Sequence, residues 1–238
     1  MFTLPNLITL LNLFFGCLAA ISILNGAYYL GIIFSLAGGL ADFLDGLVAR
    51  AMNSQSPIGK ELDSLADMVS FGFVPGLIFY KLLSMIVIWP TASVINWYAT
   101  PAFLITLFSA LRLAKFNLDN RQTYSFIGMP TPAATVWALG WLWLAAEGMD
   151  ENLPWLFSPA VLYIVIVLIS FLLVAEIPMF SLKFQNFSWK DNAVRYLFVI
   201  ALAVVFITIP LFGPYLVIPL YILFSILGNI KSNEEAEL

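Results

Sequence analysis

Apolar stretches recur along the whole chain, each close to the roughly 20 residues that a helix needs to cross a bilayer. A backbone in the hydrocarbon core must satisfy its own hydrogen bonds, which a helix does within a single segment. We therefore predict an all-α integral membrane protein, a polytopic bundle of about eight transmembrane helices. The predicted helices are residues 5–24, 28–52, 59–89, 96–116, 130–148, 155–176, 193–209 and 213–230.

The composition excludes a soluble globular protein. Hydrophobic residues make up 62% of the sequence, only 10% is charged, and the mean hydropathy is +0.97. Soluble domains carry about 25% charged residues, because they must cover a surface that faces water. We predict one membrane domain over residues 1–230, followed by a disordered cytoplasmic tail at 231–238. The single cysteine, Cys17, excludes a disulfide framework.

The basic residues predict how the chain is oriented. Eight spans place both termini on the same side, and nine lysines or arginines fall on that side while Lys81 alone falls on the other. Basic residues are enriched in cytoplasmic loops, so we expect both termini in the cytoplasm and the protein in the inner, cytoplasmic membrane. The nine residues are Arg50, Lys60, Arg112, Lys115, Arg121, Lys183, Lys190, Arg195 and Lys231.

Four aspartates interrupt this apolar pattern within residues 39–72, "GLADFLDGLVARAMNSQSPIGKELDSLADMVSFG". An ionised carboxylate at mid-bilayer costs roughly 2.5–3.5 kcal/mol on insertion scales. The predicted helix at 59–89 is longer than the hydrocarbon core requires, so its first turns should lie at the depth of the lipid headgroups. We expect the carboxylates to line a cavity that opens to the cytoplasm.

The spacing of the polar and small residues places them on two facing helix surfaces. Residues three, four, seven or eight positions apart share one face of a helix. Two helices joined by a short loop then direct four carboxylates at each other. The two sets are Asp42, Asp45, Gly46, Ala49 and Arg50 on one helix, and Gly59, Asp63 and Asp67 on the next.

Converging carboxylates repel one another unless a cation neutralises them. The chain contains no histidine, so a metal would be held by oxygen, which suits Mg²⁺, Mn²⁺ or Ca²⁺. Two such ions about 3.5–4 Å apart would also suit a displacement at phosphorus. Gly46, Ala49 and Gly59 leave room for a large ligand, and the Arg50 guanidinium suits a phosphate group.

Other interpretations remain open for these residues. A single aspartate in a membrane helix more often pairs helices or lines an ion path, and glycines often serve helix packing. A cation transporter could use the acidic cluster, but it would not need Gly59 or Arg50, nor a cluster confined to one side of the membrane.

The ordered pattern Asp42-x2-Asp45-Gly46-x2-Ala49-Arg50-x8-Gly59-x3-Asp63-x3-Asp67 resembles, without a departure, the signature of the CDP-alcohol phosphatidyltransferase family. The segment "PNLITLLN" resembles the family's entry into its first helix. Further segments resemble the branch of the family that uses serine. They are "GKELDSLADMVSFG" at 59–72, "LRLAKFN" at 111–117, "GMPTPAA" at 128–134 and "IPMFSLK" at 177–183.

The resemblance implies an enzyme that displaces CMP from a CDP-linked lipid with the hydroxyl of an alcohol. It implies that Asp42, Asp45, Asp63 and Asp67 bind Mg²⁺ or Mn²⁺ at two sites, and that Asp67 is also the general base. The residues that it implies for binding of the CDP-lipid are Asn6, Gly46, Ala49, Arg50, Ser56 and Gly59.

The same branch implies CDP-diacylglycerol and L-serine as substrates and phosphatidylserine as the product. Arg112 and Lys115 offer cations for the serine carboxylate, although basic residues at helix ends also extend to lipid headgroups. The alternative acceptors are glycerol 3-phosphate and an inositol phosphate, which would need additional cations. Beyond these substrates and membrane lipid, we expect a homodimer by analogy with the family, and no nucleic-acid partner.

Overall fold

The computed structural model describes residues 3–54, 56–86, 95–118, 126–179 and 189–236, and nearly all of these residues are helical. The predicted all-α membrane fold is confirmed. The helices are α1 Leu4–Leu24, α2 Tyr28–Ala51, α3 Pro57–Asp67, η1 Met68–Phe73, α4 Val74–Ile86, η2 Thr100–Phe103, α5 Leu104–Leu118, α6 Thr131–Ala146, α7 Met149–Asn152, α8 Pro159–Val174, α9 Trp189–Thr208, η3 Pro210–Phe212 and α10 Gly213–Ala236.

The helices long and apolar enough to span a membrane number five within the described residues. Pro159–Val174 and Asn192–Thr208 are shorter apolar helices. The five are Leu4–Leu24, Tyr28–Ala51, Pro57–Ile86, Thr100–Leu118 and Pro210–Gly228.

Each predicted helix overlaps an observed one, and most predicted ends differ from the observed ends by a few residues. The end of the predicted helix 59–89 falls outside the described residues beyond Ile86, as do Arg121 and Lys183 of the charge count. Where we expected a tail from residue 231, α10 continues as a helix to Ala236. Glutamate and alanine favour helical backbone, which accounts for this extension.

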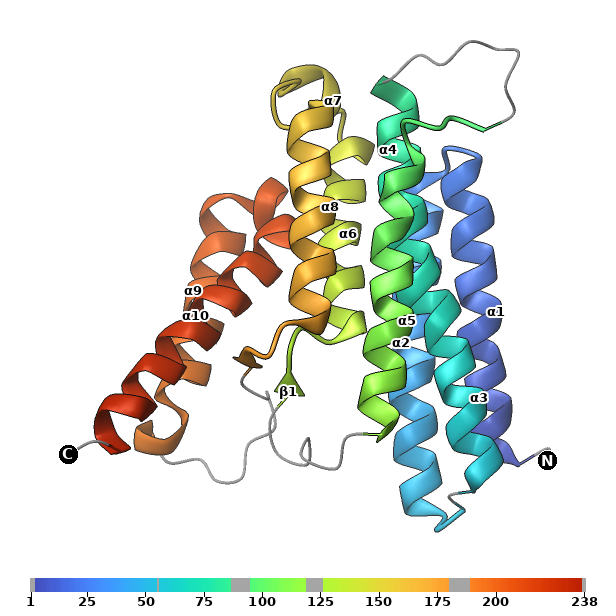
Figure 1. Cartoon of the computed structure of the whole chain (residues 1–238), viewed down its shortest axis with the longest axis vertical. Coiled ribbons are helices and arrows are strands. Elements are labelled where there is room, and N and C mark those ends of the chain that lie inside the picture. The colour runs from blue at the N-terminus through green and yellow to red at the C-terminus, as the bar shows by residue number, and fades with distance from the viewer. Residues whose placement is uncertain (1–2, 55, 87–94, 119–125, 180–188, 237–238) are drawn as a thin grey trace.

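Successive long helices alternate in direction, so that the N- and C-termini lie at the same end of the bundle (Figure 1). The helices α9 and α10 slant away from the others at one side. A short antiparallel pairing joins β1 Phe126–Ile127 to β2 Pro178–Met179 at the end where the termini lie. The common location of the two termini is the arrangement that the predicted spans require.

Aromatic residues of α4, α6 and the segment before α8 form the centre of the core. The ring centroids of Trp141 and Phe79 are 6.1 Å apart, and those of Trp141 and Phe157 are 5.5 Å apart. The Trp141 side chain is completely buried. Because α3, η1 and α4 form one continuous helix, this packing also fixes the position of the carboxylates on α3.

The turn between α2 and α3 is set by local signals. Ser56 precedes the helix and accepts a hydrogen bond from the Gly59 amide at 3.1 Å. Pro57 occupies the first turn, where its missing N–H leaves no helical hydrogen bond unmade. Asp63 and Asp67 therefore lie on a helix whose N-terminus is well capped.

The helix changes to π geometry directly after Asp67, where the sequence predicts a continuous α-helix. Thr106 of α5 donates to the Gly72 carbonyl at 3.0 Å. The Thr135 hydroxyl of α6 lies 3.3 Å from the Phe71 carbonyl and 3.1 Å from the Thr131 carbonyl of its own helix, and its one proton is shared between these two acceptors. Hydroxyls from two neighbouring helices thus reach carbonyls in the wider turn. Such π segments occur frequently at functional sites.

Candidate active site

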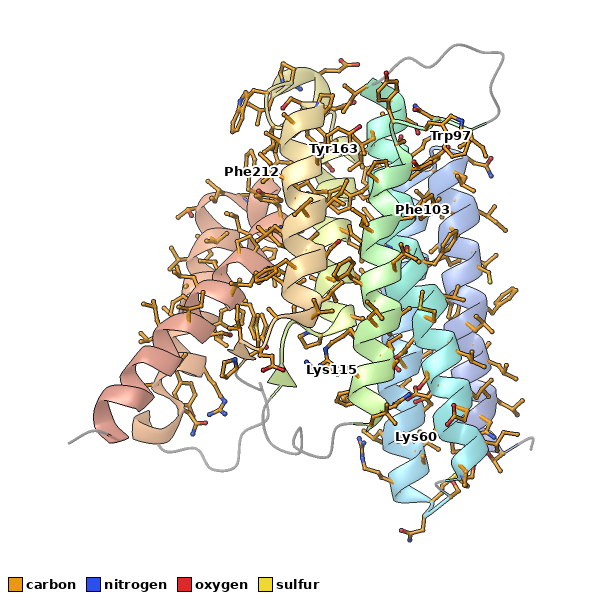
Figure 2. The ribbon with its side chains drawn as sticks, viewed as in Figure 1. Lys60, Trp97, Phe103, Lys115, Tyr163 and Phe212 are labelled. Atoms are coloured by element: carbon orange, nitrogen blue, oxygen red, sulfur yellow. The ribbon has the colours of Figure 1, made fainter. Side chains whose placement is uncertain are left out.

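A cavity of about 480 Å³ opens between α1, α2 and α3. Lys60, which lines it, lies at the same end of the bundle as Lys115 and at the opposite end from Trp97 (Figure 2). All six residues expected to bind the CDP-lipid line this cavity. The full lining is Pro5, Asn6, Thr9, Asp45, Gly46, Ala49, Arg50, Ser54, Ser56, Pro57, Gly59, Lys60 and Asp63.

Three of the four aspartates form a tight carboxylate cluster. Asp42, Asp63 and Asp67 each offer an oxygen atom, and these atoms lie within 4.8 Å of one another. All three side chains are partly buried. The aspartate-bearing faces of α2 and α3 thus lie close together, as the spacing of the residues predicts. The two helices are connected in the chain by the turn at Ser56.

Asp45 lies beside this cluster, outside the trio, and lines the cavity together with Asp63. Its side chain is 6% exposed, and its Oδ2 has no hydrogen-bond partner within the described part of the chain. A buried carboxylate oxygen without a donor is unfavourable, and a bound cation removes that penalty. The four carboxylates therefore fit a site for a divalent metal with oxygen ligands.

Gly59 lies where α1 approaches α3 closely. A Cβ atom at this position would lie 3.0 Å from the Asn6 Oδ1 and 3.1 Å from the Ser56 Oγ. A Cβ on Gly46 would meet only the Arg50 guanidinium, at 3.6 Å. The two glycines thus have different roles: Gly59 permits helix contact at the cavity wall, and Gly46 leaves space beside Arg50.

The two candidate acceptor-binding residues lie outside the cavity lining. Arg112 is 4% exposed, and its guanidinium carbon lies 5.1 Å from the centre of the Phe116 ring. Lys115 forms an ion pair with Glu176, with 3.1 Å between Nζ and Oε1. The structure thus brings the carboxylates and the CDP-lipid residues together. Arg112 and Lys115 lie on α5, outside the set of residues that line the cavity.

Two pairs of neighbouring residues show at which level along the bundle Arg112 lies relative to the carboxylates. A Cβ on Gly72 would lie 3.3 Å from the Ser109 Cβ, and the Asn117 side chain donates to the Ser64 hydroxyl at 2.8 Å. Arg112 lies between Ser109 and Asn117 on α5. Asp67 lies between Ser64 and Gly72 on the neighbouring helix, so the two residues occupy a similar level in the bundle.

Sequence reasoning missed three residues of α1 and α3 at this site. Thr9 and Lys60 line the cavity, and the Asn12 side chain donates to Asp67 at 3.4 Å between Nδ2 and Oδ1. The missed signal is the spacing of Asn6, Thr9 and Asn12, which are three positions apart in an otherwise apolar helix. That spacing keeps polar groups near one face of α1, the side that meets α2 and α3.

Comparisons with known proteins agree with this geometry. The sequence profile described as CDP-alcohol phosphatidyltransferase matches residues 2–228. A protein of Bacillus subtilis named CDP-diacylglycerol–serine O-phosphatidyltransferase is 34% identical over 137 residues, which are 55% of this chain and 70% of that protein. A protein of the same name from Methanocaldococcus jannaschii is 29% identical over 229 residues, which are 96% of this chain and 94% of that protein.

A third relative of that name, from Helicobacter pylori, is 36% identical over 138 residues, and the match spans 57% of this chain and 55% of that protein. Enzymes of this kind depend on divalent metals, in agreement with the donor set of the carboxylate cluster. The profile match covers the cavity, the carboxylates and almost all of the helices. The chain therefore belongs to the CDP-alcohol phosphatidyltransferase family.

Proposed function

We propose that this protein transfers the phosphatidyl group of CDP-diacylglycerol to the hydroxyl of L-serine, with release of CMP and formation of phosphatidylserine. The observation that carries the proposal is one cavity lined by all six expected CDP-lipid residues and adjoining the carboxylate cluster. The names of the similar bacterial and archaeal proteins support serine as the acceptor.

The cavity wall suits a nucleotide diphosphate on its approach to the carboxylates. Arg50 and Lys60 supply positive charge at the wall, and the Ser54 and Ser56 hydroxyls supply hydrogen bonds. Gly46 and Ala49 keep that side of the cavity free of long side chains. In the proposal, the diphosphate lies along α2 and α3, and Asn6 of α1 reaches the nucleotide.

We assign Mg²⁺ or Mn²⁺ to the carboxylates of Asp42, Asp45, Asp63 and Asp67, with two sites. Held by these carboxylates, a divalent cation would neutralise the diphosphate and the negative charge that develops on the departing CMP. Without such neutralisation, an anionic lipid would be repelled by the two carboxylates that line the cavity, Asp45 and Asp63, and by the adjoining Asp42 and Asp67.

The reaction in this proposal is one displacement at phosphorus. The serine hydroxyl oxygen bonds to the phosphorus attached to diacylglycerol, and the bond from that phosphorus to the oxygen bridging the two phosphates breaks. CMP leaves with the bridging oxygen. Asp67 accepts the hydroxyl proton, because an alcohol is a weak nucleophile until that proton is removed.

Arg112 is the proposed partner of the serine carboxylate. It lies at a level similar to that of Asp67, on the helix next to the π segment. A guanidinium can bind a carboxylate through two parallel hydrogen bonds. Lys115, one turn further along α5, adds positive charge on the same approach in this proposal.

The proposal places the termini and the cavity on the cytoplasmic side of the inner membrane, because the basic residues of the sequence gather at that end. It also includes the homodimer that the family resemblance implies. A membrane-impermeant maleimide tests the orientation in a chain whose Cys17 is replaced by alanine. Asp150→Cys in α7 should react in intact cells, and Ser54→Cys at the cavity should react only after lysis.

The activity is tested by CMP release from CDP-diacylglycerol in detergent micelles. With purified protein and Mg²⁺ or Mn²⁺, release should require L-serine, and glycerol 3-phosphate or an inositol phosphate should not replace it. Release with either phosphorylated alcohol and none with serine would transfer the proposal to that acceptor. Absence of release with every acceptor would contradict the proposal altogether.

A further inference from the structure

A buried asparagine of α1 contacts the carboxylate cluster from outside the cavity. Asn12 is 0% exposed, and its Nδ2 donates to the Asp67 Oδ1 at 3.4 Å. Its Oδ1 is buried too and has no hydrogen-bond partner among the residues that the structure describes. Burying an amide with one unsatisfied group is less favourable than burying an apolar side chain, so packing alone does not explain an asparagine here.

The backbone around Asn12 is held as firmly as its side chain. The Ser70 hydroxyl donates to the Asn12 carbonyl at 3.1 Å, three residues beyond Asp67. Gly16, one turn along α1, faces Ser70, where a Cβ would collide with the Ser70 hydroxyl. The residues of α1 and of η1 therefore meet at contact distance directly behind Asp67.

The second membrane helix closes the other side of the asparagine. A Cβ on Gly38 would lie 3.3 Å from the Asn12 Oδ1 and 3.5 Å from its carbonyl oxygen. Gly38 is one turn before Asp42, so the Asn12 amide lies near both helices that carry the cluster. The Asn12 amide thus lies between Asp67 and the backbone of α2 at Gly38.

We propose that Asn12 is a positioning residue that sets the orientation of the Asp67 carboxylate within the cluster. Its Nδ2 holds Oδ1, which leaves the second carboxylate oxygen of Asp67 for the side shared with Asp42 and Asp63. The bond from Ser70 to the Asn12 carbonyl keeps the asparagine at the level of Asp67 where the helix changes to π geometry. The inference rests on the metal site of the proposed function.

At metal sites in general, a residue that hydrogen-bonds a metal ligand fixes the orientation of that ligand. Loss of such a residue weakens metal binding or activity about 10- to 100-fold. Asn12 acts here on a residue proposed to bind metal and to accept the serine proton. Its loss should therefore affect metal binding and turnover together, and should leave the cavity wall that holds CDP-diacylglycerol unchanged.

The test is direct Mn²⁺ titration of the purified full-length protein in detergent, without substrate, followed by electron paramagnetic resonance. Asn12→Leu keeps a similar side-chain volume and removes the donor, and Asn12→Ala removes both. The matched control is Ser22→Ala, which removes another buried polar group of α1 whose hydroxyl donates to Leu18 of the same helix. Each variant is first checked by size-exclusion chromatography for an unaltered elution volume. The titration can be carried out if at least one Asn12 variant passes this check.

Both Asn12 variants should need at least about 10-fold more Mn²⁺ for half-saturation, and kcat should fall by a similar factor. At saturating Mn²⁺, the KM for CDP-diacylglycerol should stay unchanged in the Asn12 variants. The Ser22→Ala variant should match the unaltered protein in both Mn²⁺ affinity and kcat. Unaltered Mn²⁺ affinity in Asn12→Leu would overturn the inference, even if Asn12→Ala were impaired, because packing would then explain the residue.

The result separates this inference from the proposed function. If the unaltered protein binds Mn²⁺ and the Asn12 variants bind it weakly, the inference stands even where CMP release shows a different acceptor. If the unaltered protein binds no Mn²⁺, the metal site fails, and the inference is overturned with it.

Discussion

Asp42 and Asp67 lie on two different membrane helices, and they present carboxylate oxygens within 4.8 Å of each other. Two ionised carboxylates at this separation repel strongly in a medium of low dielectric constant, and Asp63 adds a third. A divalent cation between them would remove this repulsion. This relationship connects the fold to its proposed chemistry.

Asp63→Ala should reduce CMP release to below a few per cent of the unaltered rate at saturating Mg²⁺. The carboxylate belongs to the cluster and to the cavity lining, so its loss removes a proposed metal ligand. Elution volume and helical content should not change. The matched control is Glu61→Ala, an exposed carboxylate two positions away on α3, which should retain full activity. Substantial turnover in Asp63→Ala would show that the metal assignment is wrong.

Asp67→Asn should separate binding from turnover. The amide keeps the size and polarity of the side chain, but it cannot accept the serine proton and carries no charge for the metal. The dissociation constant for CDP-diacylglycerol should therefore rise less than kcat falls. Equal losses in binding and turnover would mean that Asp67 serves only as a ligand.

Gly59→Ala should weaken binding of the CDP-lipid. The added methyl group would lie 3.0 Å from the Asn6 Oδ1 and 3.1 Å from the Ser56 Oγ, and it would displace two residues of the cavity wall. The KM for CDP-diacylglycerol should rise several-fold while the KM for serine changes little. Gly39→Ala is the control, since its nearest contact is a Phe71 ring carbon at 3.8 Å. Equal KM values for the two variants would remove Gly59 from the substrate site.

Arg112→Lys should raise the KM for serine about 10-fold or more, because one charged hydrogen bond is worth roughly 1.5–3 kcal/mol. Lysine cannot reproduce the paired hydrogen bonds of a guanidinium. The KM for CDP-diacylglycerol should stay unchanged, since Arg112 is not among the residues that line the cavity. An unaltered KM for serine would show that Arg112 serves the packing against Phe116 instead.

The membrane helices and the facing aspartates could be predicted because both follow from local periodicity. Apolar length predicts the spans, and the spacing of Asp63 and Asp67 predicts their common face. The six residues expected for the CDP-lipid also share one cavity. The spans and the common face depend on neighbouring residues of the chain, which a single sequence displays directly, whereas the CDP-lipid residues follow from the family resemblance.

The features that could not be predicted depend on contacts between distant helices. The π segment after Asp67 is supported by Thr106 and Thr135, which lie on two other helices. The contact of Asn12 with Asp67 likewise needs the packing of α1 against α3. Arg112 was expected to offer a cation for the serine carboxylate, and its buried position beside Phe116 depends on how α5 packs.

The most direct measurement of the central claim uses L-serine labelled with ¹⁸O in its hydroxyl group. The protein is incubated with CDP-diacylglycerol and Mg²⁺ or Mn²⁺, and the products are analysed by mass spectrometry. Attack of the hydroxyl on phosphorus predicts that phosphatidylserine retains the ¹⁸O between phosphorus and the serine carbon, with CMP formed in equal amount and unlabelled. Phosphatidylserine without the label, or release of CMP with no labelled lipid, would contradict the account.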